Sequence, residues 1–67
     1  MDLSEAMDMA INDERALQEK YSRLAQEENN PFVKAFLERI VVDAKKHEKR
    51  LRKKYEKLLA GLKKKAF

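Results

Sequence analysis

A seven-residue repeat of apolar side chains constrains this chain more than any other feature. In two stretches, the repeat positions recur at alternating spacings of four and three, which indicates a helix packed along a second helix. The two seams are Leu3, Met7, Ala10, Glu14, Leu17, Tyr21 and Leu24, and Val33, Leu37, Ile40, Ala44, His47 and Leu51. Glu14 and the only histidine, His47, are the polar interruptions that need a partner, because burying either of them alone is costly.

The ends of both helices are marked by capping residues. Asp2 followed by Glu5 predicts a capping box at the start of the first helix. We expect Asn29 to close that helix in the left-handed conformation, and Asn30 to cap a second helix whose first residue is Pro31. The expected organisation is a single domain, residues 1–67, with a helix over about 3–28, a turn at 29–30, a helix over about 31–60 that stops at Gly61, and a basic tail at 61–67.

A turn this short makes the two helices antiparallel neighbours. Glu14 lies 15.5 residues before the centre of the turn and His47 lies 17.5 residues after it. At about 1.5 Å per residue, their heights along the hairpin differ by roughly 3 Å. The sequence therefore predicts that the carboxylate and the imidazole face each other.

The chain is too short to be comfortably stable as a lone hairpin. It has 67 residues and no cysteine, so disulfides and thiolate metal sites are excluded. Self-association, metal or both would supply the missing stability. We therefore expect an all-α fold in which two hairpins form a four-helix bundle as a homodimer, with assembly into a higher oligomer left open. Two copies of Glu14 and of His47 would then converge.

Several residues, taken together in order and spacing, resemble the rubrerythrin branch of the ferritin-like superfamily. They are Glu14, Tyr21, Leu24-Ala25, Asn30-Pro31, Phe36-Leu37, Asp43 and His47. The resemblance implies a four-helix bundle that holds a di-iron centre, with a ligand Glu from one helix of each half and a Glu-x-x-His pair from the other. It also implies reaction of that iron with oxygen or peroxide, as an oxidoreductase or a ferroxidase.

Carried over position by position, the resemblance makes Glu14 and His47 metal ligands and places Tyr21 near the metal. The chain departs from the pattern at Ala44, where the family has the bridging Glu. Asp43 is therefore a substitute ligand, a residue that orients the imidazole of His47, or simply a surface acid. Iron is the expected metal, with zinc or another divalent ion as the alternative.

Two other interpretations stay open at this point. Glu14 and His47 could form a metal-free polar pair in a structural or protein-interaction module that has kept the fold and lost the di-iron centre. The basic run in the second helix could contact nucleic acid. It consists of Lys45, Lys46, Lys49, Arg50, Arg52, Lys53, Lys54 and Lys57.

Against a nucleic-acid partner, the hairpin places the basic run opposite Asp2, Glu5 and Asp8. We therefore expect a solvated, partly neutralised face and no nucleic-acid partner. We find neither a signal peptide nor an apolar run long enough to span a bilayer, so the expected location is the cytoplasm.

Overall fold

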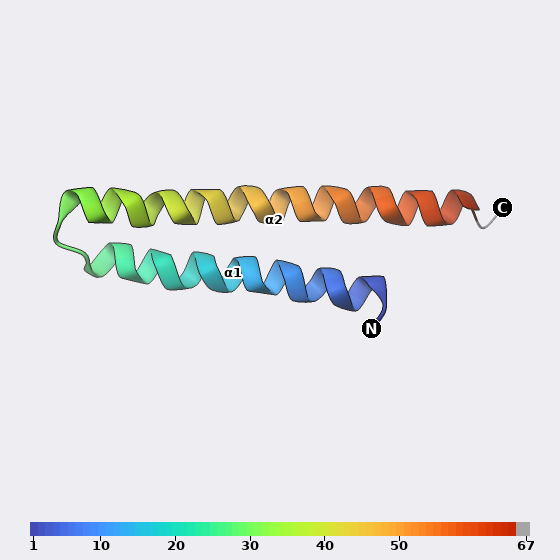
Figure 1. The fold of residues 1–67 in the computed structure, drawn as a ribbon, viewed down its shortest axis with the longest axis horizontal. Helices are drawn as coiled ribbons and strands as arrows, with labels where there is room; N and C mark the ends of the chain where they lie inside the picture. Colours follow the sequence, from blue (N-terminus) through green and yellow to red (C-terminus); the bar gives the residue numbers. More distant parts are fainter. Residues whose placement is uncertain (66–67) are drawn as a thin grey trace.

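The structure is a computed structural model that describes residues 1–65, with side chains described up to Gly61. It contains two helices, α1 (Leu3–Glu27) and α2 (Pro31–Lys65), and no strand among the residues described. The helices run antiparallel, side by side, in a hairpin 57 Å long (Figure 1). The predicted all-helical hairpin is confirmed.

Side-chain caps begin both helices, although the predicted capping box is formed only in part, because the described chain has no bond from the Asp2 backbone N–H to the Glu5 side chain. The backbone N–H of Glu5 donates to Asp2 Oδ1 over 2.8 Å. Asn30 Oδ1 accepts from the backbone N–H groups of Phe32 (2.9 Å) and Val33 (3.3 Å). These bonds satisfy amides that have no partner within the helix, so Asp2 begins α1, and Asn30 begins α2 with Pro31 as its first residue.

Two expectations about helix ends are wrong. Asn29 is not left-handed, because no residue of the described chain has a positive φ, and α1 instead ends at Glu28 in extended backbone (φ −81°, ψ 128°). The second helix does not stop at Gly61 but continues to Lys65. Gly61 keeps a negative φ, and no proline follows it to break the helix. The last two residues of the predicted basic tail, 66–67, lie outside the described residues.

The contact between the helices uses the predicted stripe on α2, where Ala44 is buried, but a neighbouring stripe on α1. Ile11 and Ala25 of α1 and Ala44 of α2 are the buried apolar residues of the described chain. Leu17 and Leu24, which were predicted to face α2, remain 40% and 41% exposed. The small side chains Ala25 and Ala44 let the helices approach closely, so the adjacent leucine stripe turns to one side of the hairpin.

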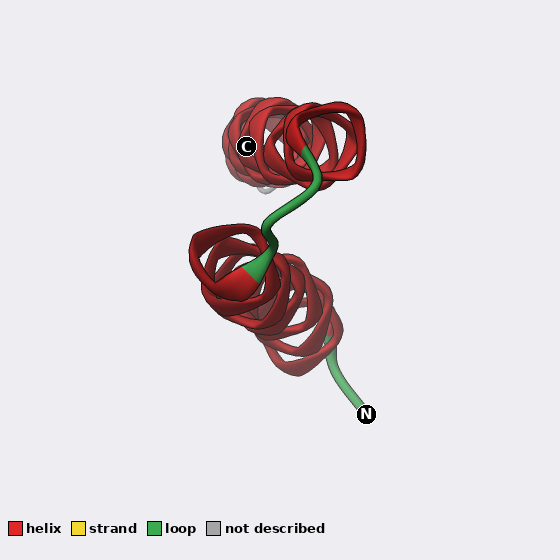
Figure 2. Cartoon of the chain, turned by 90° about the vertical axis from the view of Figure 1, so that its left-hand side faces the viewer, coloured by secondary structure: helices red, strands yellow, loops and turns green. Residues whose placement is uncertain are grey.

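One broad side of the hairpin consequently carries an apolar strip. Seen along the helices, the described chain forms one layer, with no other element against either broad side (Figure 2). The strip consists of Leu17, Leu24, Val33, Phe36 and Ile40, of which only Ile40 is half-buried. We call this the Glu14 side, because Glu14 and His47 lie at the margin of the strip.

Candidate metal centre

Glu14 and His47 meet across the hairpin, as the count of residues from the turn predicts. His47 Nδ1 lies 3.6 Å from Glu14 Oε1, a distance for an ion pair when the imidazole is protonated. α1 supplies the carboxylate and α2 the imidazole, and only the antiparallel register brings them together. The two side chains differ in burial: Glu14 is 19% exposed and His47 is 56% exposed.

The second carboxylate oxygen of Glu14 has no partner. Glu14 Oε2 is buried and makes no hydrogen bond. A buried carboxylate oxygen without a donor or cation is unfavourable, and natural proteins rarely leave one in that state. This atom therefore needs a proton, a cation or a donor from outside the described hairpin.

A depression of about 150 Å³ adjoins this pair. Its lining is Glu14, Leu17, Ile40, Asp43, Ala44 and His47. Four residues singled out from the sequence thus share one concave surface. They are Glu14, His47, Asp43, and Ala44, which stands where the family pattern has a Glu. A second depression, of about 240 Å³, adjoins the same pair and adds the cationic side chains of Arg50 and Lys54.

The remaining candidate residues make no bond to Glu14 or His47 within the described chain. Asp43 Oδ1 lies 3.5 Å from Nε of Arg39, one turn earlier on α2, and no bond joins Asp43 to His47 within the described chain. The ring of Tyr21 is half-buried, with Lys20 Nζ 5.6 Å from its centroid. Ala44 is buried and offers only a methyl group.

One hairpin alone does not provide a complete metal site. Residues 1–65 bring together no group of three or more His, Cys, Asp or Glu side chains suited to hold a metal ion. Glu14 and His47 are a carboxylate oxygen and an imidazole nitrogen, both suitable ligands for Fe²⁺ or Zn²⁺. A tetrahedral site needs four such atoms, so two hairpins with Glu14 and His47 from each would match that number.

The sequence analysis missed a polar cluster on the other broad side of the hairpin. Glu48 of α2 accepts hydrogen bonds from Arg15 Nε (3.2 Å) and Gln18 Nε2 (3.2 Å) of α1 and from Arg52 Nε (3.1 Å) of its own helix. The hydrogen bond from Arg52 is the main cause that lowers the pKa of Glu48, and Gln18 and Arg15 add to it against the opposing effect of burial. The four-residue spacing of Glu48 and Arg52 in the sequence could have predicted the ion pair within α2, but not the bonds from Arg15 and Gln18 of α1.

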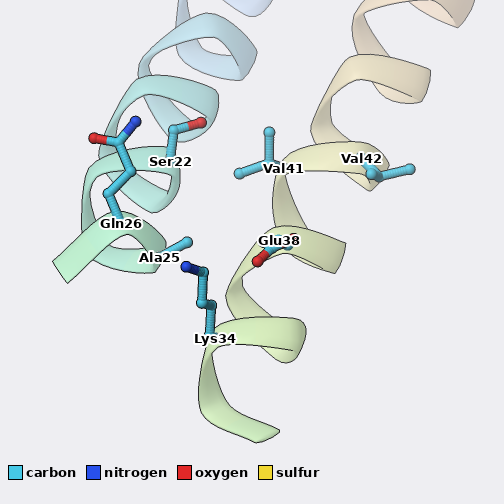
Figure 3. Close-up of a pocket in the computed structure, with 7 residues that line it drawn as sticks. All are labelled: Ser22, Ala25, Gln26, Lys34, Glu38, Val41 and Val42. Carbon is cyan, nitrogen blue, oxygen red and sulfur yellow. The ribbon is translucent and has the colours of Figure 1, made fainter. Parts of the chain in front are cut away.

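The same side holds a depression of about 300 Å³ near the turn, drawn in Figure 3. Val41 projects between the helices there, whereas Val42 points away from α1. Its other lining residues are Ser22, Ala25, Gln26, Lys34 and Glu38. It contains a single carboxylate and no imidazole, so it offers no comparable set of metal ligands.

Comparison with models of protein families shows to which family this chain belongs. The rubrerythrin family model matches residues 1–55, which covers both helices through Tyr55. The chain belongs to the rubrerythrin family. The predicted resemblance to rubrerythrin-type, ferritin-like proteins is thereby confirmed. A comparison with curated proteins gave no match, and neither did a comparison with solved structures.

Rubrerythrin-family proteins usually bind iron. In this rubrerythrin-family chain, Glu14 and His47 lie opposite each other across the hairpin, and the residue three positions before His47 is Ala44. In the part of the chain that the structure describes, no helix has a stretch both long and apolar enough to cross a bilayer.

Proposed function

We propose that two copies of this hairpin bind iron, or another divalent metal such as zinc, between them through Glu14 and His47 of each copy. The observation that carries the proposal is the buried, unpartnered Glu14 Oε2. A metal ion would satisfy this oxygen and would offset the cost of burying it. Iron bound there would supply redox chemistry towards oxygen or peroxide.

The position of the apolar strip supports a second hairpin on the Glu14 side. Leu17 and Ile40 of the strip line the same depression as Glu14 and His47. A partner that covers the strip would therefore also cover the depression and bring its own pair of ligands close. On the opposite broad side Arg15 and Gln18 both donate hydrogen bonds to Glu48, so this polar side is a poorer surface for a dimer.

In such a dimer the residues of this chain have separate tasks. Glu14 would bind the metal through the oxygen that lacks a partner, and His47 would bind it through a neutral imidazole nitrogen. Leu17 and Ile40 would limit the access of water. Ala44 leaves room where the family places a second carboxylate, so small ligands could reach the metal there.

The test is the metal content per chain, measured by elemental analysis after anaerobic loading with Fe²⁺, together with the thermal melting temperature with and without metal. We expect about one metal ion per two chains, and a rise in melting temperature because the ion binds only the folded dimer. Glu14→Ala and His47→Ala should each abolish both effects. Glu38→Ala, which removes a carboxylate from the opposite side, should leave them unchanged.

Ala44→Glu restores the Glu-x-x-His spacing and should raise the metal content to about two ions per two chains. If the parent dimer stays folded and binds no metal, or if Glu14→Ala binds as much as the parent, the proposal fails. Glu14 and His47 would then be a structural polar pair in a metal-free module.

A further inference from the structure

The outward face of α2 carries a concentrated positive charge that the metal proposal does not use. A depression of about 220 Å³ is lined by four cationic side chains and by nothing else: Lys46, Lys49, Arg50 and Lys53. All four residues are exposed. We call this set the basic face.

Three residues of the basic face, Lys46, Lys49 and Lys53, lie on the side of α2 that points away from α1. Lys53 follows the buried Ala44 by nine residues, and nine residues at about 100° each place it on the opposite side of the helix. Phe36, in the apolar strip, is about 80° from Ala44 by the same count. A dimer formed through the Glu14 side would therefore leave Lys46, Lys49 and Lys53 open to solvent, and Arg50, which also lines the second depression beside Glu14 and His47, lies at the border between the two surfaces.

Within the described hairpin, the basic run is neutralised at Arg52, which pairs with Glu48, but not by the acidic residues at the start of α1. Asp2, Glu5 and Asp8 were expected to face the basic run, but no ion pair of the described chain joins any of them to α2. None of the four basic-face residues has an ion pair among residues 1–61 either. Residues 45–57 contain eight basic and two acidic residues, and one of the two, Glu48, is already bound by Arg15 and Arg52.

We propose that the basic face binds the phosphate backbone of double-stranded nucleic acid without regard to sequence. From Lys46 to Lys53 the face extends roughly 10 Å along the helix, and the phosphates of one strand are about 3.4 Å apart, so several phosphates can be contacted together. Because the proposal uses neither Glu14 nor His47, it does not depend on metal binding.

Two features favour a duplex over other polyanions. Single-stranded nucleic acid is usually bound by aromatic side chains that stack on bases, and the only aromatic residue of 45–57 is the half-buried Tyr55. A helix that lies on a membrane needs an exposed apolar face beside its charges, and no apolar side chain lines this depression. Charge alone, arranged on a rigid helix, suits the regular backbone of a duplex.

The experiment is fluorescence anisotropy of a labelled mixed-sequence duplex, titrated with the full chain at several salt concentrations. If each of the four cations neutralises one phosphate, the slope of log K against log salt is about −3.6, and affinity falls about 150-fold between about 50 and 200 mM salt. Lys46→Gln with Lys49→Gln should halve the slope to about −1.8. Arg23→Gln with Lys34→Gln removes the same charge elsewhere and should keep the parent slope.

Circular dichroism checks that each variant keeps its helices, since all four substituted residues are exposed. Absence of duplex binding at about 50 mM salt overturns the proposal. So does an equal loss of affinity in the control pair, because net charge rather than the basic face would then be responsible. Tighter binding to a single strand of the same length, or to vesicles containing phosphatidylglycerol, also overturns it.

Discussion

Phe36→Ser tests whether the Glu14 side is the surface on which two hairpins meet. Phe36 is 65% exposed in the single hairpin. With about 200 Å² for a phenylalanine side chain, roughly 130 Å² is open to water, and covering it contributes about 3 kcal/mol at 25 cal/mol per Å². A symmetric dimer contains this residue twice, so full coverage stabilises the dimer by about 6 kcal/mol.

The substitution should therefore weaken dimerisation by about four powers of ten in Kd, and by about two powers of ten when half of the surface is covered. Sedimentation velocity or light scattering over a range of concentrations measures this shift. Val42→Ser is the matched control, because Val42 is 42% exposed but points away from α1 and lies outside the strip (Figure 3).

The reasoning is refuted if Phe36→Ser dimerises like the parent chain. It is equally refuted if Val42→Ser dissociates the dimer and Phe36→Ser does not, because the copies would then meet away from Glu14 and His47. In either case the two pairs of ligands would not converge, and the metal site would need a different partner.

Two further predictions concern stability. The lowered pKa of Glu48 means that its ionised form stabilises the fold above the ordinary carboxyl pKa of 4.5, and that this contribution is lost as the pH falls through the lower folded-state pKa. Glu48→Gln should therefore lower the melting temperature at pH 7, and the difference from the parent should shrink at acidic pH; a difference that grows there would contradict the cluster. Gly61→Ala should stabilise α2 by about 0.5 kcal/mol, because a Cβ there meets nothing within 4 Å and alanine favours a helix over glycine. Circular dichroism would show this as higher helicity, and lower helicity would mean that the helix does not pass through residue 61.

The local signals in the sequence were reliable because they act over three or four residues. Asp2 and Asn30 cap the helices through bonds to amides two or three residues ahead. The break at Asn29–Pro31 fixed the antiparallel pairing, and a count of residues from it placed Glu14 opposite His47, as the 3.6 Å distance shows. Gly61 misled the prediction because a glycine near a helix end permits a stop but does not impose one.

The seven-residue repeat could not show which of two neighbouring stripes of α1 packs against α2. Ala10, Leu17 and Leu24 on one side, and Ile11, Gln18 and Ala25 on the other, obey the same spacing of sevens. The larger leucines predicted the first stripe as the seam, yet close packing of Ala25 against α2 selects the second. Glu48 and its partners Arg15 and Gln18 belong to that selected seam or its edge, so they were missed together.

The sequence by itself determined the two helices, their caps, their direction and the heights of Glu14 and His47, because each of these follows from short-range bonds and a constant rise per residue. Only the tertiary structure decided the rotation of α1 about its own axis. That rotation depends on how side chains of different size fit between two helices, which no single helix contains. It buried one oxygen of Glu14 without a partner and left the leucines of the apolar strip beside it uncovered.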